Sequence, residues 1–131
     1  MKVDANYFKS VYPKIIEALR LVAAPASVQL SSLPKHVCKP DEIAFTFEEI
    51  MIYAKILMEN KFLSIDLYLQ LLAIDKLFEN LKKDEWTEDS LHKSKSWEVV
   101  RTKAIEVLKN FGEGYTAPNL FWATSIPKDR G

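Results

Sequence analysis

The chain has 131 residues, of which 48% are apolar and 27% are charged, and its formal net charge at neutral pH is zero. A chain of this length buries roughly two-thirds of its extended surface on folding. We therefore expect a single helical domain over residues 1–131, with residues 128–131 frayed. The composition excludes an intrinsically disordered chain. The only glycines are residues 112, 114 and 131, which excludes a glycine-rich phosphate-binding loop.

The cysteine content and the hydropathy pattern predict the compartment. Cys38 is the single cysteine, so no internal disulfide can form and a reducing cytosol is favoured. The first residues lack the uninterrupted apolar stretch of a secretory signal. No run of about 18 apolar residues predicts a membrane span. We expect a cytoplasmic protein that does not contact membrane.

Charge is unevenly distributed along the chain. Residues 41–92 carry twelve acidic and five basic side chains, a net charge of −7, and the two flanking segments together carry +7. A partner with a basic surface would be attracted to this acidic middle. Because nucleic acids are polyanions, direct binding of DNA or RNA is not expected.

The first predicted elements are two helices separated by a proline. Apolar residues over positions 4–22 recur with helical spacing. Pro13 removes one backbone hydrogen bond and clashes with the preceding turn, so we predict a short helix, a kink, and a second helix from Pro13. Residues 24–40 contain three prolines and three serines. This predicts a long connection with one helical turn near residues 27–32.

Two central helices are predicted next. Residues 41–45 are expected to be extended, and Thr46 and Glu49 then match a capping box that begins a helix over residues 47–59. Ser64 is expected to cap a further helix over residues 65–82. Both helices are apolar on more than one side, which is typical of helices at the centre of a bundle.

Residues 86–111 carry the clearest helical signals. Thr87 and Ser96 are candidate N-caps, and Gly112 is a candidate left-handed residue at the helix end. The tail up to residue 126 is aromatic without helical periodicity, and we expect it to fold back on the helices. The sequence thus predicts an all-α fold, a bundle of about five helices with a non-helical aromatic C-terminal tail packed on it.

Signals for catalysis are weak. His36 and Cys38 lie two residues apart in a proline-bounded loop, but no third group is identified that would orient the histidine as a base. With two histidines and one cysteine, no closely spaced pair of metal ligands exists. Adjacent carboxylates such as Glu48 and Glu49 are explained by first-turn positions, where the helix dipole favours negative charge. The sequence therefore predicts neither an enzyme nor a bound cofactor or metal.

A mixed acidic and apolar face is the strongest candidate for binding. Glu48, Glu49 and Glu59 share the helix over residues 47–59 with Tyr53 and Ile56. If this face is exposed, Tyr53 and Ile56 are anchors inside an acidic rim that suits a basic partner. The alternative is that these apolar residues belong to the core, because periodicity alone does not distinguish a core from an interface.

A family resemblance adds to these observations. The residues that carry it are Trp86, Leu91, Trp97, Glu98, Arg101, Ala104 and Leu108, with Asn6-Tyr7-Phe8 and Phe45-Thr46-Phe47 as further matching segments. This pattern resembles the small immunity proteins of bacterial polymorphic toxins, including those of contact-dependent growth inhibition. The resemblance implies a cytosolic protein that binds and blocks one cognate toxin domain, often a nuclease. It implies no individual binding residues.

These observations favour a non-catalytic interaction protein, most concretely an immunity protein that covers the basic active-site surface of a toxin domain. We expect a monomer when free and a 1:1 complex with the toxin. A helical adaptor is the main alternative, and a small enzyme using Cys38 and His36 is a weaker one. The candidate partner-binding residues are Glu48, Glu49, Tyr53, Glu59, Asp84, Glu85, Glu88 and Asp89.

Overall fold

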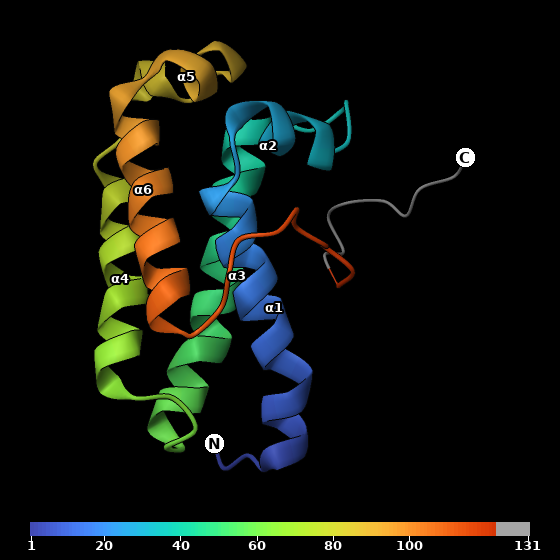
Figure 1. The fold of residues 1–131 in the computed structure, drawn as a ribbon, viewed down its shortest axis with the longest axis vertical. Coiled ribbons are helices and arrows are strands. Elements are labelled where there is room, and N and C mark those ends of the chain that lie inside the picture. Colours follow the sequence, from blue (N-terminus) through green and yellow to red (C-terminus); the bar gives the residue numbers. More distant parts are fainter. Residues whose placement is uncertain (123–131) are drawn as a thin grey trace.

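The computed structural model describes residues 1–122, which form an all-α fold without strands (Figure 1). Four long helices pack around one core, each antiparallel to its two neighbours, in the cyclic order α1, α3, α4, α6. Two short helices and a 3-10 turn lie at one end of the bundle. The elements are α1 (Ala5–Ala23), α2 (Ala26–Ser32), α3 (Lys39–Glu59), α4 (Ile65–Glu79), the 3-10 turn η1 (Lys83–Glu85), α5 (Glu88–Lys93) and α6 (Lys95–Asn110). The all-α prediction is confirmed, with six α-helices in this part of the chain instead of about five.

Helix α1 is continuous, so the predicted division at Pro13 is wrong. Asp4 caps its N-terminus by accepting a hydrogen bond from the backbone N–H of Tyr7. Pro13 lies inside the helix but faces solvent, as does Lys9 one turn earlier. Water can therefore hydrate the Lys9 carbonyl that Pro13 leaves without a backbone donor. The buried face on the other side of α1 holds the helix together across the proline.

Helix α3 begins eight residues earlier than predicted, and the predicted extended segment over residues 41–45 belongs to it. Pro40 occupies the first turn, where a missing N–H costs no intrahelical hydrogen bond. Asp41 and Glu42 follow in the same turn, where negative charge is favourable. Thr46 is therefore a buried residue inside the helix and does not cap it. The predicted helical turn near residues 27–32 is confirmed as α2.

The remaining helix ends are partly as predicted. Ser64 caps α4 through the N–H of Leu67, although α4 ends at Glu79 and not at residue 82. Thr87 caps α5 as expected. Ser94, not Ser96, caps α6, because its hydroxyl accepts hydrogen bonds from two backbone N–H groups of the first turn.

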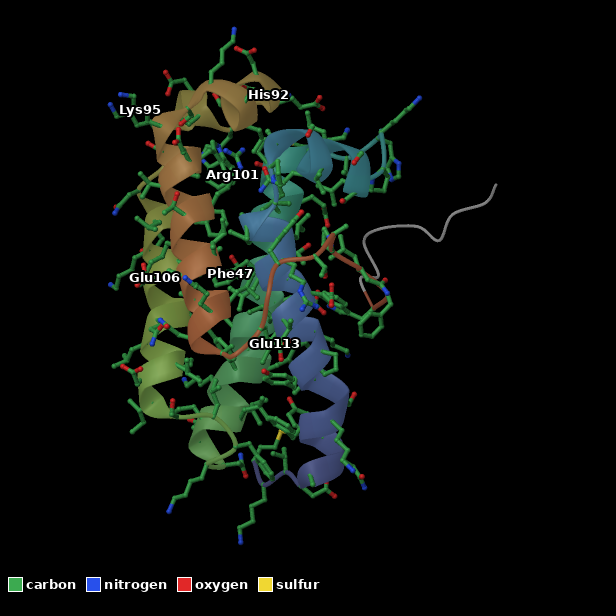
Figure 2. The ribbon with its side chains drawn as sticks, viewed as in Figure 1. Phe47, His92, Lys95, Arg101, Glu106 and Glu113 are labelled. Atoms are coloured by element: carbon green, nitrogen blue, oxygen red, sulfur yellow. The ribbon has the colours of Figure 1, made fainter. Side chains whose placement is uncertain are left out.

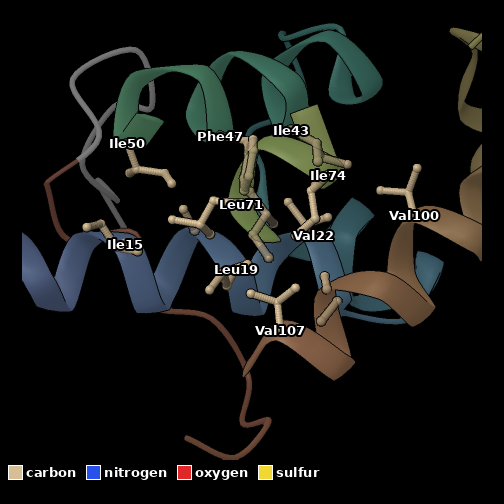
Figure 3. Close-up of a cluster of buried hydrophobic side chains, with 14 of the residues drawn as sticks. Ile15, Leu19, Val22, Ile43, Phe47, Ile50, Leu71, Ile74, Val100 and Val107 are labelled. Carbon is tan, nitrogen blue, oxygen red and sulfur yellow. The ribbon is translucent and has the colours of Figure 1, made fainter. Parts of the chain in front are cut away.

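The core fills the space between the four long helices (Figure 3). Each long helix contributes side chains that are fully buried, among them Ile15, Phe47, Ile74 and Val107. An aromatic chain crosses the core from Phe47 through Phe78 and Trp97 to Trp86, with successive ring centroids 5.7, 5.7 and 5.8 Å apart.

Residues 113–122, which we call the C-terminal strap, run back from the end of α6 along α1 (Figure 1). The Tyr12 hydroxyl donates to Glu113 at 3.0 Å, and the Arg20 guanidinium donates to the Gly114 carbonyl at 3.0 Å. Leu120 and Trp122 pack against the core. The predicted non-helical tail on the bundle is thus confirmed up to residue 122, and residues 123–126 of that prediction lie outside the described part. Among residues 1–122 no helix has the length and hydropathy that crossing a membrane requires.

Candidate docking groove

A groove of about 590 Å³ opens between α3 and α4. We call it the α3–α4 groove. Phe78 forms part of its floor and is itself in contact with Phe47 of the core. The lining residues are Asp41, Ala44, Phe45 and Glu48 of α3, Asp75, Phe78 and Glu79 of α4, and Trp86.

Helical spacing brings these residues together. On α3, Asp41, Phe45 and Glu48 are four and three residues apart, so they lie on one face of the helix. Asp75 and Glu79 are four residues apart on α4 and likewise share a face. Because the two helices are antiparallel neighbours, these faces form the two walls of the groove.

Trp86 is positioned by the segment that follows α4. Its ring lies edge-on to Trp97, at a centroid distance of 5.8 Å. The Trp97 indole N–H donates to the Glu85 carbonyl at 2.8 Å, which fixes the backbone just before Trp86. The Glu85 carboxylate accepts hydrogen bonds from the Lys82 N–H and from the Ser94 hydroxyl. The aromatic end of the groove is therefore built on a hydrogen-bonded turn.

The groove has a strongly acidic lining. Four of its eight lining residues are carboxylates and none is basic. Burial raises the pKa of the Asp75 carboxyl, and the negative charges of Glu79 and Glu48 raise it further, while Lys76 opposes them. Glu79 and Glu48 therefore disfavour the ionised form of Asp75, and a cationic group bound in the groove would offset their effect.

Phe45 is an exposed aromatic side chain within this acidic surface. The ring lines the groove, and 59% of the residue is accessible to solvent. Exposed phenylalanine among carboxylates provides apolar contact area and charge attraction at the same place. The arrangement suits a protein ligand that carries both apolar and basic side chains.

The predicted partner-binding residues of α3 fall on two sides of that helix. Glu48 is exposed and lines the groove. Glu49 accepts a hydrogen bond from the Tyr53 hydroxyl at 3.1 Å, and the Lys14 ammonium of α1 lies 5.1 Å from the centre of the Tyr53 ring. Glu49 and Tyr53 therefore face α1, away from the groove. Glu59 is exposed in the last turn of α3.

The other predicted residues lie around η1 and α5. Glu85 is half-buried, and the Ser94 hydroxyl that donates to its carboxyl holds the pKa of that carboxyl below its usual value. Glu88 pairs with Lys39 at 3.4 Å. Asp84 and Asp89 are exposed, and Asp89 pairs with Lys93 one turn along α5. These four carboxylates do not line the α3–α4 groove.

Of the eight lining residues, the predicted binding set contained only Glu48, and the missed residues include the charged or exposed side chains of Asp41, Phe45, Asp75 and Glu79. Two were hidden because residues 41–45 were assigned to an extended segment. Continuing the helical spacing backward from Glu48 would have placed Phe45 and Asp41 on the same face. No sequence signal pairs them with Asp75 and Glu79, since that pairing depends on which helix lies beside α3.

The residues of the alternative catalytic pair lie at the surface. His36 and Cys38 are both exposed in the loop before α3, and no hydrogen bond joins their side chains in the described structure. Over residues 1–122, no group of three or more histidine, cysteine or carboxylate side chains is placed to hold a metal ion.

Comparison of the chain with protein-family models, with curated proteins and with solved structures found no significant match.

Proposed function

We propose that this chain is a non-catalytic interaction protein, an immunity protein that binds and neutralises a cognate bacterial toxin domain. The observation that carries this proposal is the α3–α4 groove, where an exposed phenylalanine lies in a concave surface lined by four carboxylates and no basic residue. The resemblance of the sequence to immunity proteins of polymorphic toxins supports the choice of partner.

The charge of the groove suggests the chemistry of that partner. Nucleases bind polyanionic substrates and so need basic surfaces around their active sites. An inhibitor that presents carboxylates can cover such a surface, and opposite charges accelerate the encounter of the two proteins. We propose that the toxin domain is a nuclease, that the free protein is a cytoplasmic monomer, and that the complex is 1:1.

Charge reversal tests this proposal. The partner to be tested is a toxin-like domain encoded by a gene adjacent to that of this chain, produced as an inactive variant for binding measurements. The double variant Glu48→Lys and Glu79→Lys changes two exposed side chains of the groove. We expect association with the toxin domain to slow by about tenfold or more at about 50 mM salt, and by less at about 200 mM salt.

A matched control carries the same change in net charge on another surface. Glu98→Lys and Glu106→Lys alter two exposed carboxylates of α6 and should leave the association rate nearly unchanged. Equal effects of the two double variants would refute the groove as the binding surface. Protection of cells from the active toxin gives the functional readout, since an adaptor would bind without neutralising it.

A further inference from the structure

The apolar surface of α3 and α4 extends beyond the groove. Ile52 and Ile65 are 61% and 66% exposed, although both belong to helices with extensive buried faces. Ile52 follows Phe45 by seven residues on α3, and the half-buried Leu72 follows Ile65 by seven residues on α4. Residues seven apart lie on the same side of a helix, roughly 10 Å apart along its axis.

On each helix, a row of residues at helical spacing continues the wall of the groove. From Asp41, the positions 45, 48, 52, 55 and 59 advance in steps of four and three residues, which keeps them on one face of α3. From Glu79, the positions 75, 72, 68 and 65 do the same on α4. The groove therefore opens into a two-helix face along both helices, which we call the α3–α4 face.

This face is uncovered within the described part of the chain. The C-terminal strap runs along α1, and α1 and α6 form the side of the bundle opposite α3 and α4. The short helices α2 and α5 lie at one end of the bundle (Figures 1 and 2). The strap buries apolar side chains against α1, whereas the α3–α4 face leaves Phe45, Ile52 and Ile65 exposed.

The charge on the face restricts its occupant. Five positions in the two rows are carboxylates and Lys55 is the single basic one; the carboxylates are Asp41, Glu48, Glu59, Asp75 and Glu79. An occupant that is only apolar would leave these charges unpaired, and an acidic one would be repelled. A complementary occupant needs an apolar row of about the same seven-residue spacing, flanked by basic side chains.

We propose that the α3–α4 face receives a basic amphipathic α-helix of the partner protein, which lays its apolar row between α3 and α4. This inference rests on the proposed function and specifies the element that the toxin domain contributes. A helix in a groove between two helices presents apolar residues at spacings of three, four and seven. A strand is a poorer fit, because its side chains alternate every two residues and no sheet edge is available among residues 1–122.

A designed peptide tests the mode of docking without the toxin. The probe is a fluorescent peptide of about 18 residues, long enough to form a helix, with leucines at heptad spacing and lysines and arginines elsewhere. A second peptide of identical composition has its leucines moved out of the heptad pattern. We expect the heptad peptide to bind the full chain about tenfold more tightly than the scrambled one. Backbone chemical shifts should change along α3 and α4.

Variants of the protein locate the binding surface. Phe45→Gln and Ile52→Gln together remove two exposed apolar side chains from the face, and glutamine is compatible with helix. Val99→Gln and Ile105→Gln remove two exposed apolar side chains from α6 and serve as the matched control. We expect only the first double variant to lose binding of the heptad peptide, by about tenfold.

Equal binding of the heptad and scrambled peptides would overturn the proposed docking of a helix. An equal loss of peptide affinity in both double variants would also overturn it. So would chemical-shift changes confined to helices other than α3 and α4. The proposed function fails separately. If the chain neutralises no toxin domain encoded by an adjacent gene but binds the heptad peptide on α3 and α4, the docking mode stands and the immunity function falls. If the chain neutralises the toxin but binds the heptad and scrambled peptides equally, the immunity function stands and the docking mode falls.

Discussion

Gln29 joins three helices through one buried side-chain amide. Its Nε2 donates to the carbonyls of Leu21 and Val22 at the end of α1, both at 3.1 Å. Its Oε1 accepts a hydrogen bond from the Arg101 guanidinium of α6 at 3.1 Å, and Arg101 also donates to the Leu91 carbonyl of α5. Figure 2 shows Arg101 directed from α6 toward this end of the bundle. The amide thus satisfies helix-end carbonyls that water does not reach.

Replacing Gln29 by alanine should therefore be costly. The change removes the side-chain donor to the Val22 carbonyl and one of the acceptors of the Arg101 guanidinium, leaves the Leu21 carbonyl with only the Ala24 N–H, and creates a cavity. We expect the free energy of unfolding to fall by about 2–3 kcal/mol. Urea titration followed by circular dichroism measures this, with Ser31→Ala at an exposed position of the same short helix as the control. A loss equal to that of the control would contradict the structural role of the amide.

The raised pKa of Asp75 predicts how the stability of the fold depends on pH. Burial, followed by the charges of Glu79 and Glu48, raises the pKa of Asp75 above its ordinary value of 3.8. The folded state therefore holds this proton more tightly than the unfolded state does. As pH rises from 3.8 through the folded pKa, this carboxyl should reduce the stability of the fold progressively.

Asp75→Asn removes that ionisation. We expect the variant to be more stable than the natural chain at neutral pH, by less than about 1 kcal/mol because the carboxyl is partly hydrated. The difference should disappear near about pH 3.5, where the natural carboxyl is protonated. Urea titrations at the two pH values measure it. A variant that is less stable at neutral pH would show that ionised Asp75 stabilises the fold.

At the scale of the elements, helix boundaries follow from cap geometry. Ser94 and Ser96 both precede the apolar row of α6, and sequence alone favoured Ser96. In the structure the Ser94 hydroxyl accepts from the N–H groups of Ser96 and Trp97, at 3.1 and 3.4 Å, and donates to Glu85. One serine therefore begins α6 and connects it to the turn beside the groove.

The two serines provide a matched test. Ser94→Ala removes the cap and should lower the free energy of unfolding by about 1 kcal/mol. Ser96→Ala replaces a residue already inside the helix, and we expect a change within about 0.5 kcal/mol. Thermal and urea unfolding of both variants gives the comparison. A larger loss for Ser96→Ala would mean that α6 begins at the later serine.

At the scale of the whole molecule, the strap and the α3–α4 face lie on opposite sides of the bundle. The strap is held by the Tyr12–Glu113 hydrogen bond, by Arg20 and by the Asn119 N–H, which donates to Glu17 at 2.9 Å. Burial, with Glu113 as a hydrogen-bond acceptor and negative neighbour, raises the pKa of the Tyr12 phenol to about 12. These contacts make the strap part of the folded structure.

Removing the strap should weaken the fold without changing the docking face. A chain ending at residue 112 loses the contacts of Leu120 and Trp122 with the core, and we expect it to be less stable by about 2 kcal/mol. A chain ending at residue 122 is the reference, so that the difference isolates residues 113–122. Binding of the heptad peptide should be the same in both. Equal stability would show that the strap contributes nothing to the fold.

Much of this fold was readable from local patterns. Helical periodicity located the apolar faces, Ser64 and Thr87 marked two helix starts, and Gly112, with its positive φ of 78°, marked the end of α6. Two of the errors involve prolines, and the others concern the caps assigned to Thr46 and Ser96 and the end of α4. Pro13 and Pro40 were interpreted as breaks, but Pro13 faces solvent inside α1 and Pro40 lies in the first turn of α3.

The binding surface was much less predictable. The sequence located an acidic middle and selected Glu48, which lines the groove. It placed Glu49 and Tyr53 on the same face as Glu48, whereas the structure turns them toward α1. Their use in binding stays a prediction, as does that of Glu59 and of the carboxylates around η1 and α5.

The sequence by itself determined the helical class and most of the helical segments, because periodic burial and caps act within a few residues along the chain. Tertiary structure decided which helices became neighbours, and with it the pairing of Asp41, Phe45 and Glu48 with Asp75 and Glu79. Such a groove depends on contacts between residues about thirty positions apart, so no local pattern encodes it. The proposed function depends on this second kind of information, since an acidic composition becomes a binding surface only when two helices bring its carboxylates and an exposed aromatic ring together.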